Sequence, residues 1–347
     1  MYIKKILWAI ALIGLIAFGA IAYYFYNAMF SPNTNFEEDS KYIFISSGDT
    51  YLQVREKLMP LLDDIDSFDA LAKQKKYVSY VKAGKYQIKN GMNNNEIINS
   101  IRSNNIAVKL SFNNQNSLEN LAGRISSQIE ADSLSLLKAM KDENFLSKTG
   151  FKTETALGMY LPNSYQVFWN TSVQDFVERM YKEYNTFWNA DRLAKAKALG
   201  FSKDEVIALA SIVYEESKQK VEQPRVAGVY INRIKIGMKL DADPTLKFAA
   251  YKLPKYKNKI IRRVLNVHKE IDSPYNTYKY AGLPPGLIAM PDLSAIDAVL
   301  NYEKHGYYYF AVDPKKPGFH RFAKSLSQHN NNARAYHRYL DQKGIKK

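Results

Sequence analysis

The stretch Ser202-Lys-Asp-Glu-Val-Ile-Ala-Leu-Ala-Ser-Ile-Val-Tyr-Glu-Glu-Ser217 predicts the helix around which the rest of the chain is organised. Ser202 suits the N-cap position, and the acids Asp204 and Glu205 in the first turn complement the helix dipole. The apolar residues that follow recur at helical spacing and form one stripe, which comprises Val206, Ile207, Leu209, Ala210, Ile212 and Val213. The sequence therefore predicts an amphipathic helix with one buried side.

Two glutamates end this helix and point in different directions. At 100° per residue, Glu216 falls at the edge of the apolar stripe, whereas Glu215 points to the opposite side. A carboxyl group held against apolar surface resists ionisation, and a carboxylic acid that is neutral near pH 7 can protonate a glycosidic oxygen. The alternative is a helix-end glutamate paired with an arginine such as Arg225 or Arg233, because buried acids are usually paired.

Further motifs follow the helix in a fixed order. They are Arg225-Val-Ala-Gly-Val-Tyr-Ile-Asn-Arg233, Gly237-Met-Lys-Leu240, Asp243-Pro-Thr245, Tyr275-Asn-Thr-Tyr278 and Gly282-Leu-Pro-Pro-Gly286. Together with Ala-Ser-Ile-Val-x-x-Glu in the helix, this series resembles the membrane-anchored endolytic murein transglycosylases of the YceG/MltG type, from about Lys41 onward. The family commonly has a second acid two positions before its catalytic glutamate, where this chain has Tyr214. The resemblance therefore implies that Glu216 is the catalytic residue, rather than Glu215.

Composition narrows the class of partner. A chain of 347 residues with 46% hydrophobic residues can form two or three packed domains. Its 49 basic and 34 acidic residues give a net charge of +15, which favours an anionic partner such as nucleic acid, lipid headgroups or an acidic cell-wall polymer. The absence of cysteine excludes a thiol nucleophile and a cysteine-ligated metal. The five histidines show no His-Glu-x-x-His spacing, so we expect no metal and no other cofactor.

The N-terminal residues indicate the compartment. After a short tail of residues 1–5, which holds Lys4 and Lys5, residues 6–30 are uncharged and mostly apolar and are long enough to cross a bilayer. Basic residues before this stretch and acidic residues after it favour a cytoplasmic tail and an extracytoplasmic remainder. The alternative is a cleaved signal peptide ending near Ala22, but the apolar run continues past that point. We therefore expect a single-pass protein of the cell (inner) membrane, a topology that argues against a nucleic-acid partner.

The remainder divides into three parts. Residues 31–40 are polar, contain a proline and read as a linker. Residues 41–106 contain two strand-turn-helix patterns, and the resemblance implies a LysM-like domain, a module associated with glycan binding. A small α/β spacer is the alternative. Residues 107–347 are expected to form a mixed catalytic domain with an open cleft, which makes the predicted fold class α+β.

Candidate substrate-binding residues lie after the central helix. A second amphipathic helix is predicted over residues 225–234, and Asn232 and Arg233 fall at its end. Asn232 can hydrogen-bond an N-acetyl group or a hydroxyl, whereas Arg233 can pair with Glu216, bind a peptide carboxylate or simply act as a cation at the helix end. Asp243 offers a second carboxylate but also suits a turn before proline. The other candidates come from the remaining motifs and are Thr245, Tyr275, Asn276, Thr277, Tyr278, His320 and His329. The two histidines read equally well as structural residues.

The resemblance also implies a reaction. Glu216 would first donate its proton to the leaving oxygen and then accept the proton of the muramic C6 hydroxyl, so that the bond between N-acetylmuramic acid and N-acetylglucosamine breaks without water and leaves a 1,6-anhydro end. Such an enzyme acts on peptidoglycan glycan strands, terminates or releases nascent strands and works beside peptidoglycan synthases. Two alternatives remain. A two-carboxylate muramidase would use Asp241 or Asp243 with Glu216, and a non-catalytic scaffold would bind glycan without cutting it.

Overall fold

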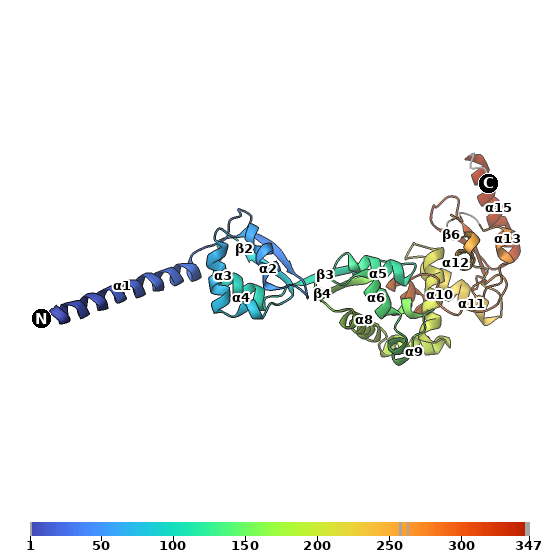
Figure 1. The fold of residues 1–347 in the computed structure, drawn as a ribbon. Coiled ribbons are helices and arrows are strands. Elements are labelled where there is room, and N and C mark those ends of the chain that lie inside the picture. Colours follow the sequence, from blue (N-terminus) through green and yellow to red (C-terminus); the bar gives the residue numbers. More distant parts are fainter. Residues whose placement is uncertain (1, 257–258, 262–263, 344–347) are drawn as a thin grey trace. The chain divides into compact units, whose positions relative to one another are not determined.

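The chain folds into two compact units. The computed structural model describes residues 2–256, 259–261 and 264–343. Unit 1 comprises residues 1–110, 127–131 and 165–172, and unit 2 comprises residues 111–126, 132–164 and 173–347 (Figure 1). Both helices and strands are present, so the predicted α+β class is confirmed.

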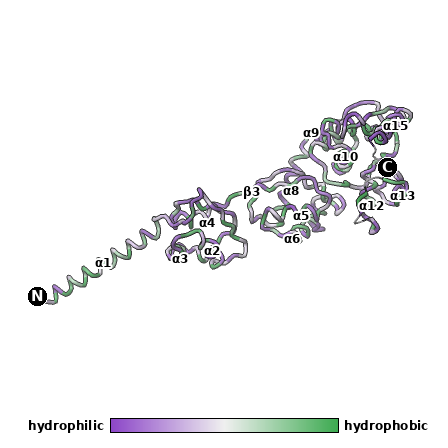
Figure 2. The backbone as a smooth tube through the Cα atoms, turned by 90° about the horizontal axis from the view of Figure 1, so that it is seen from above, coloured by the Kyte–Doolittle hydropathy of each residue, from purple (hydrophilic) through white to green (hydrophobic). Residues whose placement is uncertain are grey.

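An apolar helix opens the chain. Helix α1 spans Tyr2–Phe30, and its most apolar 18-residue window has a mean hydropathy of 2.4 and no buried residue. The hydropathy of these residues can be followed along the tube in Figure 2. By length and composition α1 can cross a membrane, which is compatible with the predicted single-pass anchor.

The end of α1 is attached to the rest of unit 1. The Asn94 side chain, which is 1% exposed, donates hydrogen bonds to the Ala28 carbonyl at 2.7 Å and to the Ser67 hydroxyl at 3.0 Å. Asn33 in turn donates to Asn94 Oδ1 at 2.7 Å and to the Asp64 carbonyl at 2.8 Å. Within residues 31–40, Asn33 thus bonds to the same unit to which the end of α1 is attached.

The remainder of unit 1 is a small α/β structure. Its elements are β1 (Ser40–Ile45), α2 (Tyr51–Leu58), η1 (Met59–Leu61), α3 (Ile65–Gln74), η2 (Tyr77–Ser79), β2 (Gly84–Lys89) and α4 (Asn94–Ser103), followed by β3 (Ala107–Phe112). Strands β1 and β2 pair antiparallel, from Ser40 opposite Lys89 to Ile45 opposite Gly84. Alternate residues of both strands, such as Ile43, Ile45 and Ile88, enter the core that the helices cover, and the residues between them point to the opposite side of the sheet.

Unit 2 is mainly helical. Its helices are α5 (Leu118–Ser126), α6 (Ser133–Met140), α7 (Glu143–Thr149), η3 (Ala156–Met159), α8 (Val173–Phe187), α9 (Ala190–Leu199), α10 (Lys203–Glu216), α11 (Gln223–Lys235), α12 (Asp243–Tyr251), η4 (Pro254–Tyr256), α13 (Asn266–Lys269), α14 (Leu293–Leu300) and α15 (Leu326–Gln342). Strand β4 (Asn163–Phe168) pairs with β3 and belongs to unit 1 from Tyr165 onward. Unit 2 also contains the antiparallel hairpin of β5 (Tyr309–Val312) and β6 (His320–Ala323).

Helices α10, α11 and α14 pack on one another in unit 2, and Tyr230 of α11 packs edge-on against Phe310 in the hairpin. The chain after α14 passes very close to α11 at Gly228, where a Cβ atom would come within 2.4 Å of the Glu303 carbonyl oxygen. Only glycine allows this approach. Beyond this contact the chain enters β5, and α15 packs on β5 as well. As a result, residues of α11, β5 and α15, which are distant from one another in the sequence, lie around the end of α10.

Candidate active site

The central helix places Glu216 as the sequence predicts. Ser202 caps α10, since its hydroxyl accepts the Glu205 amide proton at 3.2 Å while its own amide donates to the Glu205 carboxylate at 2.8 Å. Every residue from 206 to 213 is buried, so the helix is fixed in the core. Glu216 is the last residue of α10 and is half-buried, whereas Glu215 is exposed and forms an ion pair with Lys218 at 2.8 Å.

Glu216 faces a cavity of about 420 Å³ within unit 2. The cavity collects side chains from α10, α11, the 240–243 turn, the 278 loop, β5 and α15. Its lining residues are Glu216, Tyr230, Arg233, Leu240, Asp241, Asp243, Tyr278, Tyr309, Phe310, Leu326 and His329. Five of the residues predicted for the site, namely Glu216, Arg233, Asp243, Tyr278 and His329, thus share one cavity.

The pKa of Glu216 is raised to about 7. Removal of the carboxyl group from water is the main cause, and the negative charge of Asp243 adds to it. The Tyr230 hydroxyl donates a hydrogen bond to Glu216 Oε1 at 2.8 Å, and this bond favours the ionised form and opposes part of the rise. The two arginines considered as partners for Glu216 pair with other acids: Arg225 with Glu303 at 2.9 Å, and Arg233 with Asp241 at 3.4 Å. The paired-glutamate alternative is therefore not what the described residues show.

Two further carboxylates lie in the cavity. Asp243 accepts a hydrogen bond of 2.6 Å from the Tyr278 hydroxyl, which orients its side chain. Arg233 is bound mainly to backbone, with bonds to the carbonyls of Tyr308 at 2.6 Å and Leu240 at 2.8 Å. Its guanidinium therefore joins α11, β5 and the 240–243 turn, and Asp241 receives only its longest contact.

Three predicted residues lie behind the cavity and are fully buried. The Thr277 hydroxyl accepts the Ala242 amide proton at 3.0 Å and bonds the Thr245 hydroxyl at 2.8 Å. The Asn276 side-chain amide donates to the Lys269 and Ile271 carbonyls at 2.8 and 2.7 Å, and its oxygen accepts the Tyr278 amide proton at 3.0 Å. These bonds fix the turn that carries Asp243 and the loop that carries Tyr278. None of the three side chains lines the cavity.

Three other predicted residues lie outside the cavity lining. The Asn232 amide is bound to the carbonyls of His305 and Tyr307 at 2.8 and 3.0 Å and so anchors the chain before β5. His320 bonds Glu222 at 2.8 Å through Nδ1 and packs edge-on against Phe310, which itself lines the cavity. Tyr275 lines a different hollow of about 250 Å³ together with Phe248 and Lys252.

His329 has an unusual environment in the cavity. Its ring stacks on Tyr309 with 5.4 Å between centroids, and its buried Nδ1 atom lacks a hydrogen-bond partner within the described chain. Burial lowers the pKa of His329, and the nearby charge of Arg233 lowers it further. The ring is therefore held in its neutral form, which can both accept and donate a hydrogen bond.

The sequence interpretation missed Tyr230, Tyr309 and Phe310 as site residues. Tyr230 carried a usable signal, because it lies on the same helical stripe as Arg233 in α11. Tyr309 and Phe310 carried none, because a strand sequence does not reveal which helix it will pack against.

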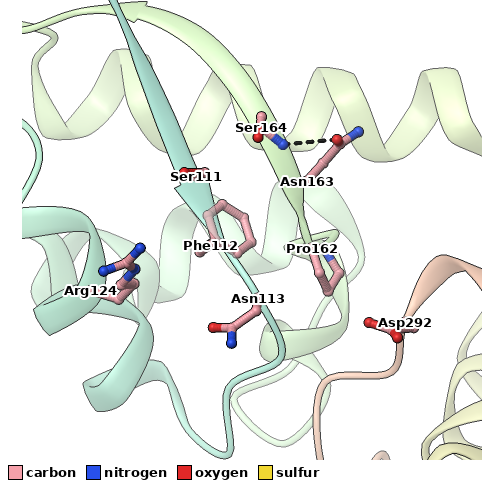
Figure 3. Close-up of a pocket in the computed structure, with 8 residues that line it drawn as sticks. All are labelled: Ser111, Phe112, Asn113, Arg124, Pro162, Asn163, Ser164 and Asp292. Carbon is pink, nitrogen blue, oxygen red and sulfur yellow. Dashed lines mark hydrogen bonds between the residues drawn. The ribbon is translucent and has the colours of Figure 1, made fainter. Parts of the chain in front are cut away.

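A larger hollow in unit 2 lies outside this site. It measures about 710 Å³ and lies between the end of β3 and the start of β4, with Arg124 on one side and Asp292 on the other (Figure 3). Pro162, Asn163 and Ser164 also line it. The chemistry is better placed in the smaller cavity, because that cavity holds the titratable group with the perturbed pKa.

The described residues also contain no cluster of three or more acidic or histidine side chains arranged to hold a metal ion.

Comparisons with known proteins agree with the motif series. The model of the YceG-like family matches residues 43–335. An endolytic murein transglycosylase of Bacillus subtilis is 29% identical over 303 residues, which cover 80% of this chain and 81% of the relative. Another from Streptococcus pneumoniae is 24% identical over 297 residues, which cover 76% of this chain but only 52% of the relative. A crystal structure of a YceG-like protein from Listeria monocytogenes superposes with a TM-score of 0.56 at 24% identity, covering 85% of this chain and 99% of that one, and so shares the fold.

Proposed function

This chain belongs to the YceG-like family, and from that premise we propose that it is an endolytic murein transglycosylase with Glu216 as its catalytic acid and base. One observation carries the proposal: Glu216 lies in a cavity lined by aromatic and carboxylate side chains, and the pKa of Glu216 is raised to about 7. At that pKa a large share of the molecules hold the proton at neutral pH, and the same group can take a proton back. The names of the relatives from Bacillus and Streptococcus support this activity.

The proposed reaction uses no water. Glu216 donates its proton to the oxygen that links muramic acid C1 to N-acetylglucosamine C4, and the C1–O bond breaks. The oxygen of the muramic C6 hydroxyl then bonds C1, and its proton passes to the Glu216 carboxylate, which restores the starting acid. Atoms and charge balance, and the product carries a 1,6-anhydro ring. The Asp243 carboxyl group, oriented by the hydrogen bond from Tyr278, stabilises the positive charge that develops at C1.

The remaining predicted residues receive supporting roles in this proposal. Arg233, Tyr278 and His329 line the cavity and contact the sugar or its peptide. Thr245, Asn276 and Thr277 act as positioning residues through the two segments that they fix. Asn232 and His320 position the β5–β6 hairpin, and Tyr275 contacts substrate outside the catalytic cavity.

The test is mass spectrometry of the fragments that the full chain, in detergent, releases from purified peptidoglycan. We expect anhydro-ended fragments from the parent protein and none from Glu216→Gln. Glu215→Gln is the matched control, because it changes the neighbouring glutamate on the exposed side of the same helix, and it should leave the yield unchanged. Equal yields from the two variants would exclude Glu216 as the catalytic group.

A two-carboxylate muramidase is the second candidate, because Asp241 and Asp243 share the cavity with Glu216. It would release reducing ends, which are heavier than anhydro ends by one water molecule, so the same spectra separate the two reactions. A scaffold that binds without cutting would give no fragments at all.

The proposed setting follows the predicted topology. Helix α1 anchors the protein in the inner membrane with a single pass, residues 41–106 form a LysM-like domain, and residues 107–347 form an extracytoplasmic catalytic domain with an open cleft. There the enzyme would cut nascent strands next to peptidoglycan synthases. Protease treatment of intact spheroplasts should degrade residues 41–347, and affinity purification should recover a synthase; full protection would contradict the orientation.

A further inference from the structure

The hollow that Phe248, Lys252 and Tyr275 line takes no part in the chemistry proposed for Glu216. This Lys252 pocket measures about 250 Å³ and lies within unit 2. Its apolar lining is buried and comprises Leu118, Leu157, Leu287 and Ile288. Its charged lining comprises Glu119, Lys141, Glu154 and Lys252. A pocket lined in this way suits a ligand that carries both small apolar groups and ionic groups.

Two aromatic rings of the pocket hold the Lys252 ammonium group. Phe248 and Tyr275 meet with 4.7 Å between ring centres, and the ammonium lies 4.7 Å from the centre of Phe248 and 5.0 Å from that of Tyr275. Cation–π attraction of this kind fixes the position of the charge. Lys252 is exposed and forms no ion pair within the described part of the chain. Its charge is therefore available to an anionic group of a ligand, whereas the ring faces that it covers are not available to a sugar.

The pocket also contains an acid without an ion-pair partner. Glu119 and Lys141 pair with each other at 2.5 Å, but Glu154 has no such partner among the residues that the structure describes. Glu154 lies next to Tyr275, because a Cβ atom on Gly286 would be 3.1 Å from both the Glu154 carbonyl oxygen and the Tyr275 hydroxyl. Burial raises the pKa of Tyr275, and the negative charge of Glu154 raises it further. The pocket thus presents one anion and one cation to a ligand, both close to the Tyr275 ring.

The same two segments line this pocket and the cavity proposed for catalysis. Helix α12 begins with Asp243, which lines the cavity, and Phe248, five residues later, lines the pocket. Five helical residues span about 8 Å along the helix axis. In the other segment Tyr278 lines the cavity, and Tyr275, three residues earlier, lines the pocket. A group bound in the pocket can therefore belong to the same substrate molecule as a sugar bound in the cavity.

We propose that the Lys252 pocket binds the peptide that peptidoglycan carries on its muramic acid. Such peptides contain alanine methyl groups, free carboxylates and, on a diamino residue, an ammonium group. Lys252 binds a carboxylate of the peptide, Glu154 binds its ammonium group, and the apolar lining receives its methyl groups. This inference rests on the proposed function, because the ligand belongs to the same polymer. The enzyme then recognises a strand by its peptides as well as by its sugars.

Binding is measured with the full chain in detergent in the Glu216→Gln background, so that the strands are not cut. The probes are soluble, uncrosslinked glycan strands that carry their peptides, and the same strands after an amidase has removed the peptides. The parent should bind the peptide-bearing strands more tightly. Lys252→Gln should lower that affinity about fivefold, the effect of one exposed ion pair, and should leave the affinity for peptide-free strands unchanged.

Two further variants separate the charge of Lys252 from other effects. Lys252→Arg keeps the positive charge and should retain the parent affinity. Lys255→Gln is the matched control, because Lys255 is an exposed lysine nearby in the sequence that lies outside the pocket lining, and it should bind as the parent does.

Three results would overturn the proposal. One is equal affinity of the parent for the two kinds of strand. Another is a Lys252→Gln variant that binds peptide-bearing strands as tightly as the parent does. The third is a loss of affinity in Lys252→Gln that is the same for both kinds of strand, because the lysine would then recognise the sugars.

Acetylation of the peptide ammonium group tests Glu154. It removes the positive charge that Glu154 is proposed to bind, so it should weaken binding to the parent about fivefold. Glu154→Gln should bind unmodified strands as weakly as the parent binds acetylated ones, and acetylation should have no further effect on this variant. An acetylation effect of the same size in the parent and in Glu154→Gln would overturn the contact between Glu154 and the peptide.

The products of the Glu216 form distinguish this inference from the proposed function. If that form makes no anhydro ends while Lys252→Gln still loses affinity for peptide-bearing strands alone, the proposed function fails and the peptide site stands. If anhydro ends form and Lys252→Gln binds both kinds of strand as the parent does, the peptide site fails alone.

Discussion

At the scale of single residues, the protonation of Glu216 decides what the cavity can do. Burial raises its pKa to about 7, Asp243 adds to the rise, and the hydrogen bond from Tyr230 opposes it. The result is a carboxyl group that lies between the states needed for donating a proton and for accepting one. Tyr230, which the sequence interpretation did not assign to the site, thus holds the pKa of Glu216 below the value that burial alone would give.

Removal of the Tyr230 hydroxyl should shift the pH dependence of the reaction. The hydroxyl stabilises the ionised carboxylate, so Tyr230→Phe should raise the pKa of Glu216 further. Since the first step needs the protonated acid, the rate falls as pH rises through this pKa, and in the variant that fall should occur at higher pH. The measurement is the pH–rate profile of anhydro-end formation. Tyr214→Phe, on the same helix as Glu216, is the control; a fall at unchanged or lower pH would contradict the role of Tyr230.

The raised pKa also predicts a cost in stability. An unfolded glutamate has a pKa of about 4.3, whereas that of Glu216 in the folded chain is about 7. Between these values the folded chain retains a proton that the unfolded chain has lost, so the stability that Glu216 confers falls as pH rises through this window. The free energy of unfolding of Glu216→Gln should therefore exceed that of the parent by an amount that grows with pH. We expect this difference to rise from about zero at pH 4 to about 3 kcal/mol at pH 8.

Denaturant unfolding of both proteins at pH 4, 6 and 8 checks this expectation. Glu215→Gln should show no such trend, because Glu215 is exposed and paired with Lys218. A constant difference between Glu216→Gln and the parent across the three pH values would argue against the raised pKa.

At the scale of elements, the site depends on segments that are tied to one another through backbone atoms. Arg233 on α11 binds the carbonyls of Tyr308 and Leu240, and Thr277 binds the Ala242 amide. Each of these bonds joins two segments that are separate in the sequence. The positions of Asp243 and Tyr278 relative to Glu216 therefore follow from buried hydrogen bonds whose loss leaves unpaired groups in the core.

The junction between α1 and the rest of unit 1 follows the same rule. Asn94→Ala removes the bonds to the Ala28 carbonyl, to Ser67 and from Asn33 in a buried position. We expect a loss of about 2 kcal/mol in the stability of unit 1 and faster hydrogen exchange of the amides of Asn33 and Asn35. Asn99→Ala, which changes an exposed asparagine on the same helix, is the control. Unchanged exchange in Asn94→Ala would show that the junction is held by other contacts.

At the scale of the whole molecule, charge and the N-terminal helix set the conditions under which the cavity meets its substrate. The net charge of +15 favours an acidic polymer, and α1 can hold the chain at a membrane. In peptidoglycan the negative charge lies on the peptides and lactyl groups, whereas the sugar backbone without them is uncharged.

Salt should therefore weaken binding in a substrate-dependent way. For the Glu216→Gln chain, affinity for peptide-bearing peptidoglycan should fall several-fold between low and high ionic strength, because exposed charges are screened beyond about 8 Å at physiological salt. Affinity for uncharged chitin oligosaccharides should change much less. Sedimentation or titration calorimetry at two salt concentrations makes the comparison. If the affinities for the two ligands depended equally on salt, electrostatic attraction would not contribute to recognition of peptidoglycan.

The sequence by itself determined local features, among them the helix that ends at Glu216. Capping residues and apolar spacing fixed α10 and α11, uncharged length predicted α1, and the direction of Glu216 followed from 100° per residue. These features depend on neighbours within a few positions in the chain, so pattern is enough to find them.

Only the tertiary structure decided which groups meet Glu216. Contacts between residues far apart in the chain give Glu216 its bond from Tyr230 and place the neutral His329 ring beside Tyr309. Such contacts also bury the side chains of Thr245, Asn276 and Thr277 outside the cavity lining. The same holds for unit 1, where segments 127–131 and 165–172 join residues 1–110 and bring Trp169 to Phe44. A pKa or a binding surface depends on what surrounds a group in space, and the order of residues along the chain does not contain that information locally.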